Sequence, residues 1–127
     1  MAWVDLVLMA ALLEYMVFGW LVGSARGRHG VKAPAMSGHP VVERWLRVHG
    51  NTLEQLIVFV PSLWGAARYW QPEYVAAIGA VFIIGRALYA VGYVKDPAKR
   101  DLGFLIGIVP VAVLLLATVV GAVRSLL

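Results

Sequence analysis

The sequence predicts an all-α integral membrane protein, a bundle of four transmembrane helices that forms a single domain over residues 1–127. Hydrophobic residues make up 61% of the chain and charged residues only 14%, and the mean hydropathy is +0.81. A soluble domain of this length could not bury so much apolar side chain. The apolar residues fall into four segments, each near the ~20 residues with which a helix crosses ~30 Å of hydrocarbon. None shows the two-residue alternation of a barrel strand, so helices are predicted throughout.

The four segments run over residues 4–22, 53–70, 74–94 and 102–123. The first contains Asp5 and Glu14 and has no basic residue before it, so it is predicted to stay in the mature protein and not to be a cleaved signal peptide. Residues 24–40 are rich in glycine and proline and predict a long loop. The second helix is expected to begin near Pro40, inside the polar layer, and to continue unbroken into the membrane.

The other two connections are short. Residues 70–72 predict a tight turn, and in residues 95–99 Asp96 is expected to cap the fourth helix, with Pro97 in its first position. Basic residues gather in the long first loop, at the start of the second helix and at residues 95–100, whereas the other side offers little beyond Arg68 and Arg124. The positive-inside bias therefore places both basic loops in the cytoplasm and both termini outside.

Composition also excludes several kinds of site. The net charge of +4 and the pI near 9.8 do not indicate a nucleic-acid-binding protein, because the basic residues flank the membrane segments and form no soluble basic face. The chain has no cysteine, which excludes disulfides, thiolate metal sites and a protein thiol nucleophile. Any sulfur chemistry must therefore arrive on a co-substrate. The three histidines lack the spacing of metal ligands, so no metal is expected.

A polar stripe leads into the second apolar segment. Groups of this kind cost roughly 2.5–3.5 kcal/mol each near the membrane centre, so a helix entering a bilayer should not carry them without a role. Both signs of charge and an amide share one helical face, from which His49 points away. We therefore expect this stripe to hold a polar ligand between helices, on the cytoplasmic side; its residues are Glu43, Arg44, Arg47, Asn51 and Glu54.

The third segment carries a matching set on the same side. Arg86, Tyr89 and Tyr93 follow at i, i+3 and i+7 and share one face, where the tyrosine hydroxyls can donate to a carboxylate. The tyrosines would equally suit an interfacial aromatic belt. Arg86 lies too deep for such a belt and is expected to need an acidic partner such as Glu54. Glu14, an acid inside the first segment, is expected to pair with Arg68 or Arg86 as a structural contact.

Arg100 is expected in the first turn of the fourth helix if Asp96 caps that helix. There the positive end of the helix and the guanidinium would together lower the pKa of a bound thiol. The alternative is ordinary positive-inside charge, which accounts for Lys95 and Lys99. A Gly103-x-x-x-Gly107 pattern in the same segment permits close contact with another helix, although such a pattern is weak evidence in a chain with 13 glycines.

Taken together, these residues resemble a known family, the membrane-associated proteins in eicosanoid and glutathione metabolism. The resemblance covers nearly the whole chain, including its hydropathy and the long first loop. Members include microsomal glutathione transferases, the leukotriene-forming synthase and the five-lipoxygenase-activating protein. The residues that carry it are Glu43-Arg44-x-x-Arg47-x-His49-x-Asn51-x-x-Glu54, Arg86-x-x-Tyr89-x-x-x-Tyr93 and Arg100-x-x-Gly103.

The resemblance implies a left-handed four-helix bundle that assembles as a homotrimer, with glutathione between subunits near the cytoplasmic face. It implies that Arg100 stabilises the glutathione thiolate. Gln55 stands where some eicosanoid-forming members have tyrosine, and the short chain without cysteine is similar to bacterial members, which implies a bacterial inner membrane. The residues that would hold glutathione by this resemblance are Arg26, Arg47, Asn51, Glu54, Tyr89 and Tyr93.

Three functions follow from these observations. The first is a detoxifying glutathione transferase, with or without peroxidase activity, that conjugates glutathione to lipophilic electrophiles drawn from the membrane lipid. The second is a non-catalytic member that binds lipid, although such a protein would have no need of Arg47, Asn51 and Arg100. The third is a small multidrug transporter with Glu14 as its proton-coupled carboxylate, which leaves the polar stripe unexplained.

Overall fold

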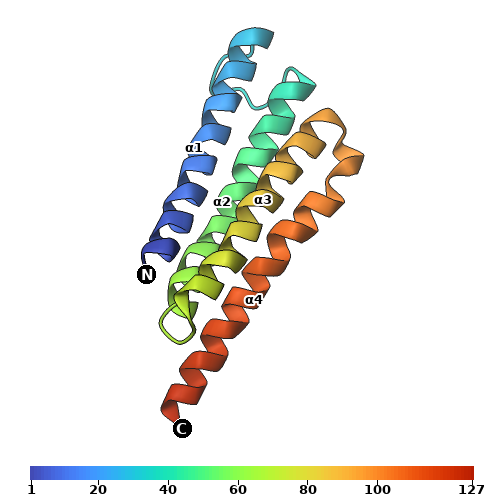
Figure 1. The fold of residues 1–127 in the computed structure, drawn as a ribbon. Helices are drawn as coiled ribbons and strands as arrows, with labels where there is room; N and C mark the ends of the chain where they lie inside the picture. The colour runs from blue at the N-terminus through green and yellow to red at the C-terminus, as the bar shows by residue number, and fades with distance from the viewer.

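The computed structural model describes all 127 residues, Met1–Leu127, and consists of helices and their connections. Their order is α1 (Ala2–His29), α2 (Pro40–Ala66), α3 (Pro72–Lys95), a short 3₁₀ helix η1 (Pro97–Lys99) and α4 (Asp101–Leu126). The four long helices lie side by side, and both termini lie at the end of the molecule that holds the α2–α3 turn (Figure 1). The long first loop and the α3–α4 connection share the opposite end. The predicted all-helical architecture is confirmed.

Three helices are long and apolar enough to cross a membrane: α1, α3 and α4 with η1 in front of it. α2 does not meet that criterion because its first half carries the polar stripe. Large apolar side chains remain exposed along all four helices, as expected where lipid or a neighbouring chain replaces water. The exposed residues include Leu13 and Trp20 on α1, Ile57 on α2, Ile84 on α3 and Leu116 on α4.

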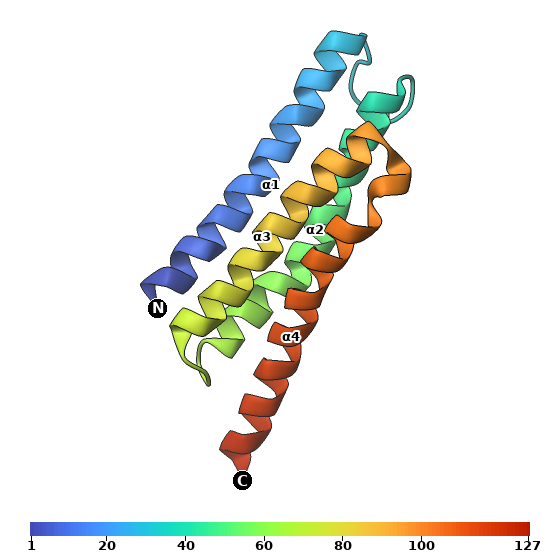
Figure 2. The same ribbon diagram turned by 45° about the vertical axis from the view of Figure 1, so that its right-hand side comes forward.

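The four helices pack to different extents, and α2 contacts α1 and α4 about equally. α3 packs most extensively on α4 and α1 on α2, while α1 and α4 lie at opposite edges of the molecule in both views (Figures 1 and 2). The main core lies between all four helices, where the rings of Phe59 and Phe82 stack with their centroids 4.0 Å apart. A smaller core of Phe18, Val48 and Tyr89 lies near the loop end. The candidate site is built above it.

Glycine sets the close approach of α3 and α4. A methyl group at Gly103 would overlap the backbone of Tyr89, and one at Gly85 would overlap the backbone of Gly107. Only glycine permits this contact, because any Cβ would force the helices apart. The close contact that Gly103 and Gly107 permit is therefore present, and its partner is α3.

Two predicted boundaries were wrong. The first loop does not begin at residue 24, because α1 continues to His29 and ends at Gly30, which takes a left-handed conformation with φ of 68°. Asp96 accepts a hydrogen bond from Ala98 N at 3.1 Å, but it caps η1 and not α4. Arg100 is consequently the N-cap residue of α4 and precedes its first turn. The predicted start of the second helix at Pro40 is confirmed.

Candidate functional site

The polar start of α2 forms one wall of the site. His39 caps this helix, its Nδ1 accepting a hydrogen bond from Val41 N at 3.2 Å, and Pro40 takes the first helical position. The helix thus begins well before the apolar segment and carries Arg47 and Asn51, four residues apart, on one face. Arg47 is exposed, whereas Asn51 is buried.

The second wall comes from α3 and the beginning of α4. Tyr89 is buried. Its backbone packs directly against Gly103, and its ring lies beside that of Phe104, with the ring centroids 6.3 Å apart. Arg100 and Asp101 follow η1 and are both exposed. Arg100 Nε and Asp101 Oδ1 are 3.9 Å apart, the only ion pair within the chain.

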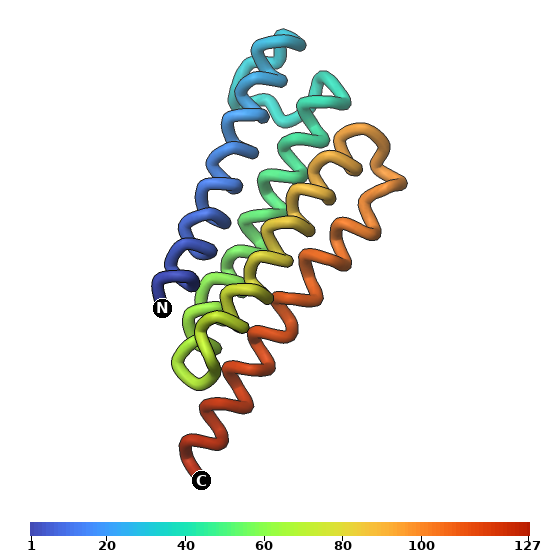
Figure 3. Tube along the Cα trace, viewed as in Figure 1, coloured from blue at the N-terminus to red at the C-terminus, as the bar shows by residue number.

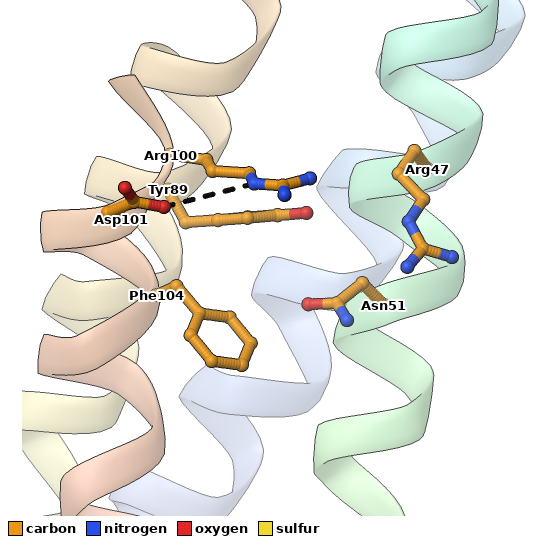
Figure 4. Close-up of a pocket in the computed structure, with 6 residues that line it drawn as sticks. All are labelled: Arg47, Asn51, Tyr89, Arg100, Asp101 and Phe104. Carbon is orange, nitrogen blue, oxygen red and sulfur yellow. Dashed lines mark ion pairs between the residues drawn. The ribbon is translucent and has the colours of Figure 1, made fainter. Parts of the chain in front are cut away.

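These two walls enclose an open pocket of about 360 Å³ at the loop end of the molecule. Arg47 and Asn51 face Arg100 and Phe104 across it, and Tyr89 lies between Arg100 and Phe104 on their side (Figure 4). Two guanidinium groups thus approach one space from different helices, with one nearby carboxylate. The lining residues are Arg47, Asn51, Tyr89, Arg100, Asp101 and Phe104.

The other three predicted ligand residues lie outside this pocket in the single chain. Glu54 is exposed and accepts a hydrogen bond from Asn51 Nδ2 at 3.3 Å. Tyr93 stacks on Tyr89, the ring centroids 5.6 Å apart and the planes within 6°. Arg26, near the end of α1, donates to the carbonyl oxygen of Ala35 in the first loop. Glu54 and Tyr93 therefore support pocket residues directly, whereas Arg26 orders the loop.

Arg44, the second residue of the polar stripe, has a structural role. Its Nη1 donates to the carbonyl oxygen of Val94 at 3.0 Å and lies 3.5 Å from that of Lys95. These carbonyls belong to the last turn of α3, which lacks helical donors for them. Arg44 thus ties the start of α2 to the end of α3 and fixes the distance between the two walls.

The predicted acidic partner of Arg86 was wrong. Arg86 is almost fully buried and donates from Nη2 to the hydroxyl of Thr52 at 2.9 Å, while its guanidinium lies 4.4 Å from the centre of the Tyr89 ring. No carboxylate forms an ion pair with it, so neither Glu54 nor Glu14 is its partner. A hydroxyl on the adjacent helix and an aromatic face replace the expected acid.

Glu14 likewise forms no ion pair with Arg86 or Arg68. Its Oε1 is buried without a hydrogen-bond partner within the chain. His49 faces away from the polar stripe, as predicted, and stacks on Tyr15 of α1 with ring centroids 4.3 Å apart.

Sequence reasoning missed Phe104, Asp101 and Thr52. Phe104 lies four residues after Arg100, so a helical register would have placed both on one face. Asp101 adjoins Arg100 in sequence. Thr52 gave no usable signal, because a hydroxyl in a helix more often bonds its own backbone, as Thr52 also does with Val48 O at 2.7 Å.

Comparison with known proteins gives this site its context. The model of the MAPEG family matches residues 4–120. An uncharacterized protein of Synechocystis is 44% identical over 125 residues, which cover 98% of this chain and 88% of that protein. Microsomal glutathione S-transferase 2 of Bos taurus is 35% identical over 94% of this chain and 84% of its own length. Leukotriene C4 synthase of Cavia porcellus is 31% identical over 74% of this chain and 63% of its own length. The chain therefore belongs to the MAPEG family of membrane proteins.

Proposed function

We propose that this protein is a membrane glutathione transferase that conjugates glutathione to lipophilic electrophiles. The observation that carries the proposal is the pocket in which Arg47, Asn51, Tyr89 and Arg100 converge from three parts of the chain. Its relatives named as microsomal glutathione S-transferase 2 and leukotriene C4 synthase support the same conclusion.

Glutathione matches the chemistry of the pocket. It carries two carboxylates, one ammonium group and one thiol, and guanidinium groups bind carboxylates with charge-assisted hydrogen bonds. We assign one carboxylate to Arg47, with Asn51 and the hydroxyls of Tyr89 and Tyr93 as further donors. Glu54 is the group assigned to the ammonium. Arg26 would contribute from the first loop.

Arg100 is assigned to the thiol. It stands at the N-terminal end of α4, where unpaired backbone N–H groups and the helix dipole favour an anion. The thiol loses its proton to water, and the thiolate then attacks the electrophilic carbon. A carbon–sulfur bond forms, the bond to the leaving group breaks, and the leaving group departs with its electron pair. No protein side chain forms a covalent bond with the substrates in these reaction steps.

We further propose a homotrimer in a bacterial inner membrane, with one domain per chain, the pocket on the cytoplasmic side and both termini outside. Arg47 and Glu54 are exposed on a membrane helix, and exposing either charged side chain to lipid costs free energy. A second subunit that packs on α2 would enclose them and complete the ligand site. Mass measurement in detergent tests this, and a stable monomer or dimer would contradict it.

The function is tested by adding glutathione and 1-chloro-2,4-dinitrobenzene to the purified protein and following the conjugate by absorbance. Wild-type protein should form the conjugate. The Lys99→Ala variant should do so as well, because Lys99 is a basic residue of the α3–α4 connection that lies outside the pocket. Arg100→Ala should lose most of its turnover. A hydroperoxide substrate in the same assay reports on peroxidase activity.

Two further results would redirect the assignment. Glutathione binding without turnover would favour a non-catalytic lipid-binding member of the family. Proton-coupled export that depends on Glu14, with no glutathione binding, would favour a transporter. A Glu14→Gln variant with wild-type turnover separates the transferase from this third function.

A further inference from the structure

Three hollows lie in a row along the α3–α4 face. They are numbered from the end of the molecule that holds the termini, so the third lies nearest the candidate site. Trp70 lines both the first and the second hollow, and Ile78 lines both the second and the third, so the hollows adjoin one another. The lining positions on α4 recur every three or four residues and form one stripe of the helix. This stripe consists of Leu105, Ile106, Val109, Pro110, Val113, Leu114, Ala117, Gly121, Arg124 and Ser125.

The first hollow, of about 290 Å³, is polar and lies at the end of the bundle. Arg124 and Trp70 form its charged and aromatic parts, with the guanidinium 5.6 Å from the centre of the indole ring. Trp70 is itself fixed, because its Nε1 donates to the carbonyl oxygen of Ala117 at 2.8 Å. Arg124 donates no hydrogen bond and forms no ion pair within the chain. The aromatic ring thus positions a cation whose N–H groups are available to a ligand.

The second and third hollows are apolar. The second, of about 450 Å³, extends from Trp70 and Tyr74 to Ile78 and Leu114. The third, of about 400 Å³, continues between Ile78 and Leu105. The acidic residue of this region, Glu73, lines a different hollow with Trp3. No carboxylate side chain therefore lines these three hollows, which together form one groove.

The first and second hollows together match one leaflet of a bilayer. Arg124 and Leu114 are ten residues apart on α4, or about 15 Å at 1.5 Å per residue. That is half of the ~30 Å thickness of the hydrocarbon core. Tyr and Trp side chains are enriched at the membrane–water boundary, where Tyr69 and Trp70 stand beside Arg124. In Figures 1 and 3 the end of α4 extends beyond the α2–α3 turn.

We propose that this groove is a phospholipid site, with the phosphate of an anionic headgroup on Arg124 and an acyl chain in the second, apolar hollow. A guanidinium binds phosphate with two parallel hydrogen bonds. Tyr69, whose hydroxyl makes no hydrogen bond within the chain, can add a third donor. An apolar helix of a partner would fill the hollows but would leave Arg124 unused. The occupant is therefore a lipid, and the site is separate from the transferase pocket at the other end.

The test measures phospholipid retained by the full-length protein. Wild-type protein, Arg124→Gln and Arg68→Gln are exchanged into detergent with dioleoylphosphatidylglycerol, and bound lipid is counted by native mass spectrometry across a lipid titration. Arg68 is the matched control, because it is exposed on the same end and lines none of the three hollows. Wild-type and Arg68→Gln should bind one lipid per chain, and Arg124→Gln should bind it about 10- to 150-fold more weakly, as expected for loss of a hydrogen bond to a charged group.

A second variant tests the apolar part independently. Ala117→Phe places a ring in the second hollow and leaves Arg124 unchanged, so it should also weaken lipid binding. Circular dichroism and gel filtration check that each variant is folded. Free glycerol phosphate at millimolar concentration should not displace the lipid.

Three results would overturn the proposal. One is unchanged lipid binding in Arg124→Gln, and another is an equal loss in Arg124→Gln and Arg68→Gln, which would indicate a general charge effect. The third is tight binding of free glycerol phosphate that Ala117→Phe leaves intact, which would indicate a small-anion site without a lipid.

Discussion

The Arg86 guanidinium donates to the Thr52 hydroxyl at 2.9 Å and thereby joins α3 to α2 at the residue next to Asn51. The same guanidinium lies over the ring of Tyr89. One buried cation therefore contacts both walls of the candidate pocket. Its Nε has no hydrogen-bond partner within the chain, so the bond to Thr52 carries much of its stabilisation.

Thr52→Val is expected to destabilise the fold. The substitution keeps the side-chain shape but removes the acceptor for Arg86, and a buried donor left without a partner costs about 1–3 kcal/mol. Thr52→Ser retains the hydroxyl and serves as the control. Denaturant unfolding in detergent, followed by circular dichroism, measures the difference. Equal stability of the two variants would mean that Arg86 finds another acceptor.

Arg47→Ala should weaken glutathione binding about 10- to 150-fold, because a hydrogen bond to a charged group contributes roughly 1.5–3 kcal/mol. Glu43→Ala changes a residue one turn earlier on the same helix, outside the pocket, and should leave affinity unchanged. Isothermal titration calorimetry with glutathione gives both values. Wild-type affinity in Arg47→Ala would place the glutathione site elsewhere.

Arg100→Ala should raise the pKa of the bound glutathione thiol, because the cation that favours the thiolate is lost. Turnover should fall more than affinity, since the interaction acts on the reacting sulfur. A pH titration of the complex, followed by the ultraviolet absorbance of the thiolate, measures the thiol pKa; the absence of cysteine removes any protein background. Lys99→Ala is the matched control. A wild-type titration curve in Arg100→Ala would reduce Arg100 to positive-inside charge.

Gly103→Ala is expected to cost about 1–3 kcal/mol of stability, since overpacking a close contact displaces backbone. The new methyl group would overlap the backbone of Tyr89 and push that side chain towards the pocket. Gly27→Ala, where the methyl group meets no atom within 4 Å, should be neutral or slightly stabilising. Thermal unfolding of both variants provides the comparison. Similar midpoints would show that α3 and α4 can separate without loss.

His29 provides a pH-dependent prediction outside the membrane. Its ring stacks on that of His39 with centroids 3.6 Å apart, and its pKa is lowered from 6.5 by desolvation first, and then by the charges of His39 and Arg28. Because the folded-state pKa lies below the unfolded value, the contribution of this packing to stability is present above pH 6.5 and declines as the pH falls through the folded-state pKa.

Proton-detected NMR titration should therefore give His29 a midpoint below 6.5. His39→Asn keeps a helix-capping acceptor but removes the stacked ring and its charge, so the midpoint should move back towards the ordinary value. A midpoint that does not respond to His39→Asn would assign the shift to the remaining surroundings.

The helices and half of the site follow from the sequence because their signals are local. Arg47 and Asn51 share a face by helical spacing alone, and Pro40 marks the start of α2. By contrast, the end of α1 was not predictable in this way. The helix continues through Gly27 and ends only at Gly30, which takes the left-handed conformation. Local patterns of this kind do not show which of two nearby glycines ends a helix.

The contacts between helices could not be predicted in the same way. Phe104 enters the pocket because Gly103 allows α4 to approach Tyr89, and this rotation of α4 is decided by packing. The partner of Arg86 was misjudged because charge pairing was the natural expectation, whereas Thr52 lies closer. Arg26 bonds to the first loop within one chain, so its proposed role depends on a second subunit.

The glycine contact between α3 and α4 also limits how the pocket can adjust. Sliding α4 by one residue along α3 moves it about 1.5 Å, and would press side chains at positions 102 and 104 against a backbone that accepts only Gly103. The backbone of Tyr89 is therefore held at one spacing from the start of α4, next to Arg100. The gap to Arg47 on α2 is held in turn by the hydrogen bond from Arg44 to the carbonyl oxygen of Val94. A ligand that bridges Arg47 and Arg100 must therefore match a preset width, so its length as well as its charge decides whether the pocket accepts it.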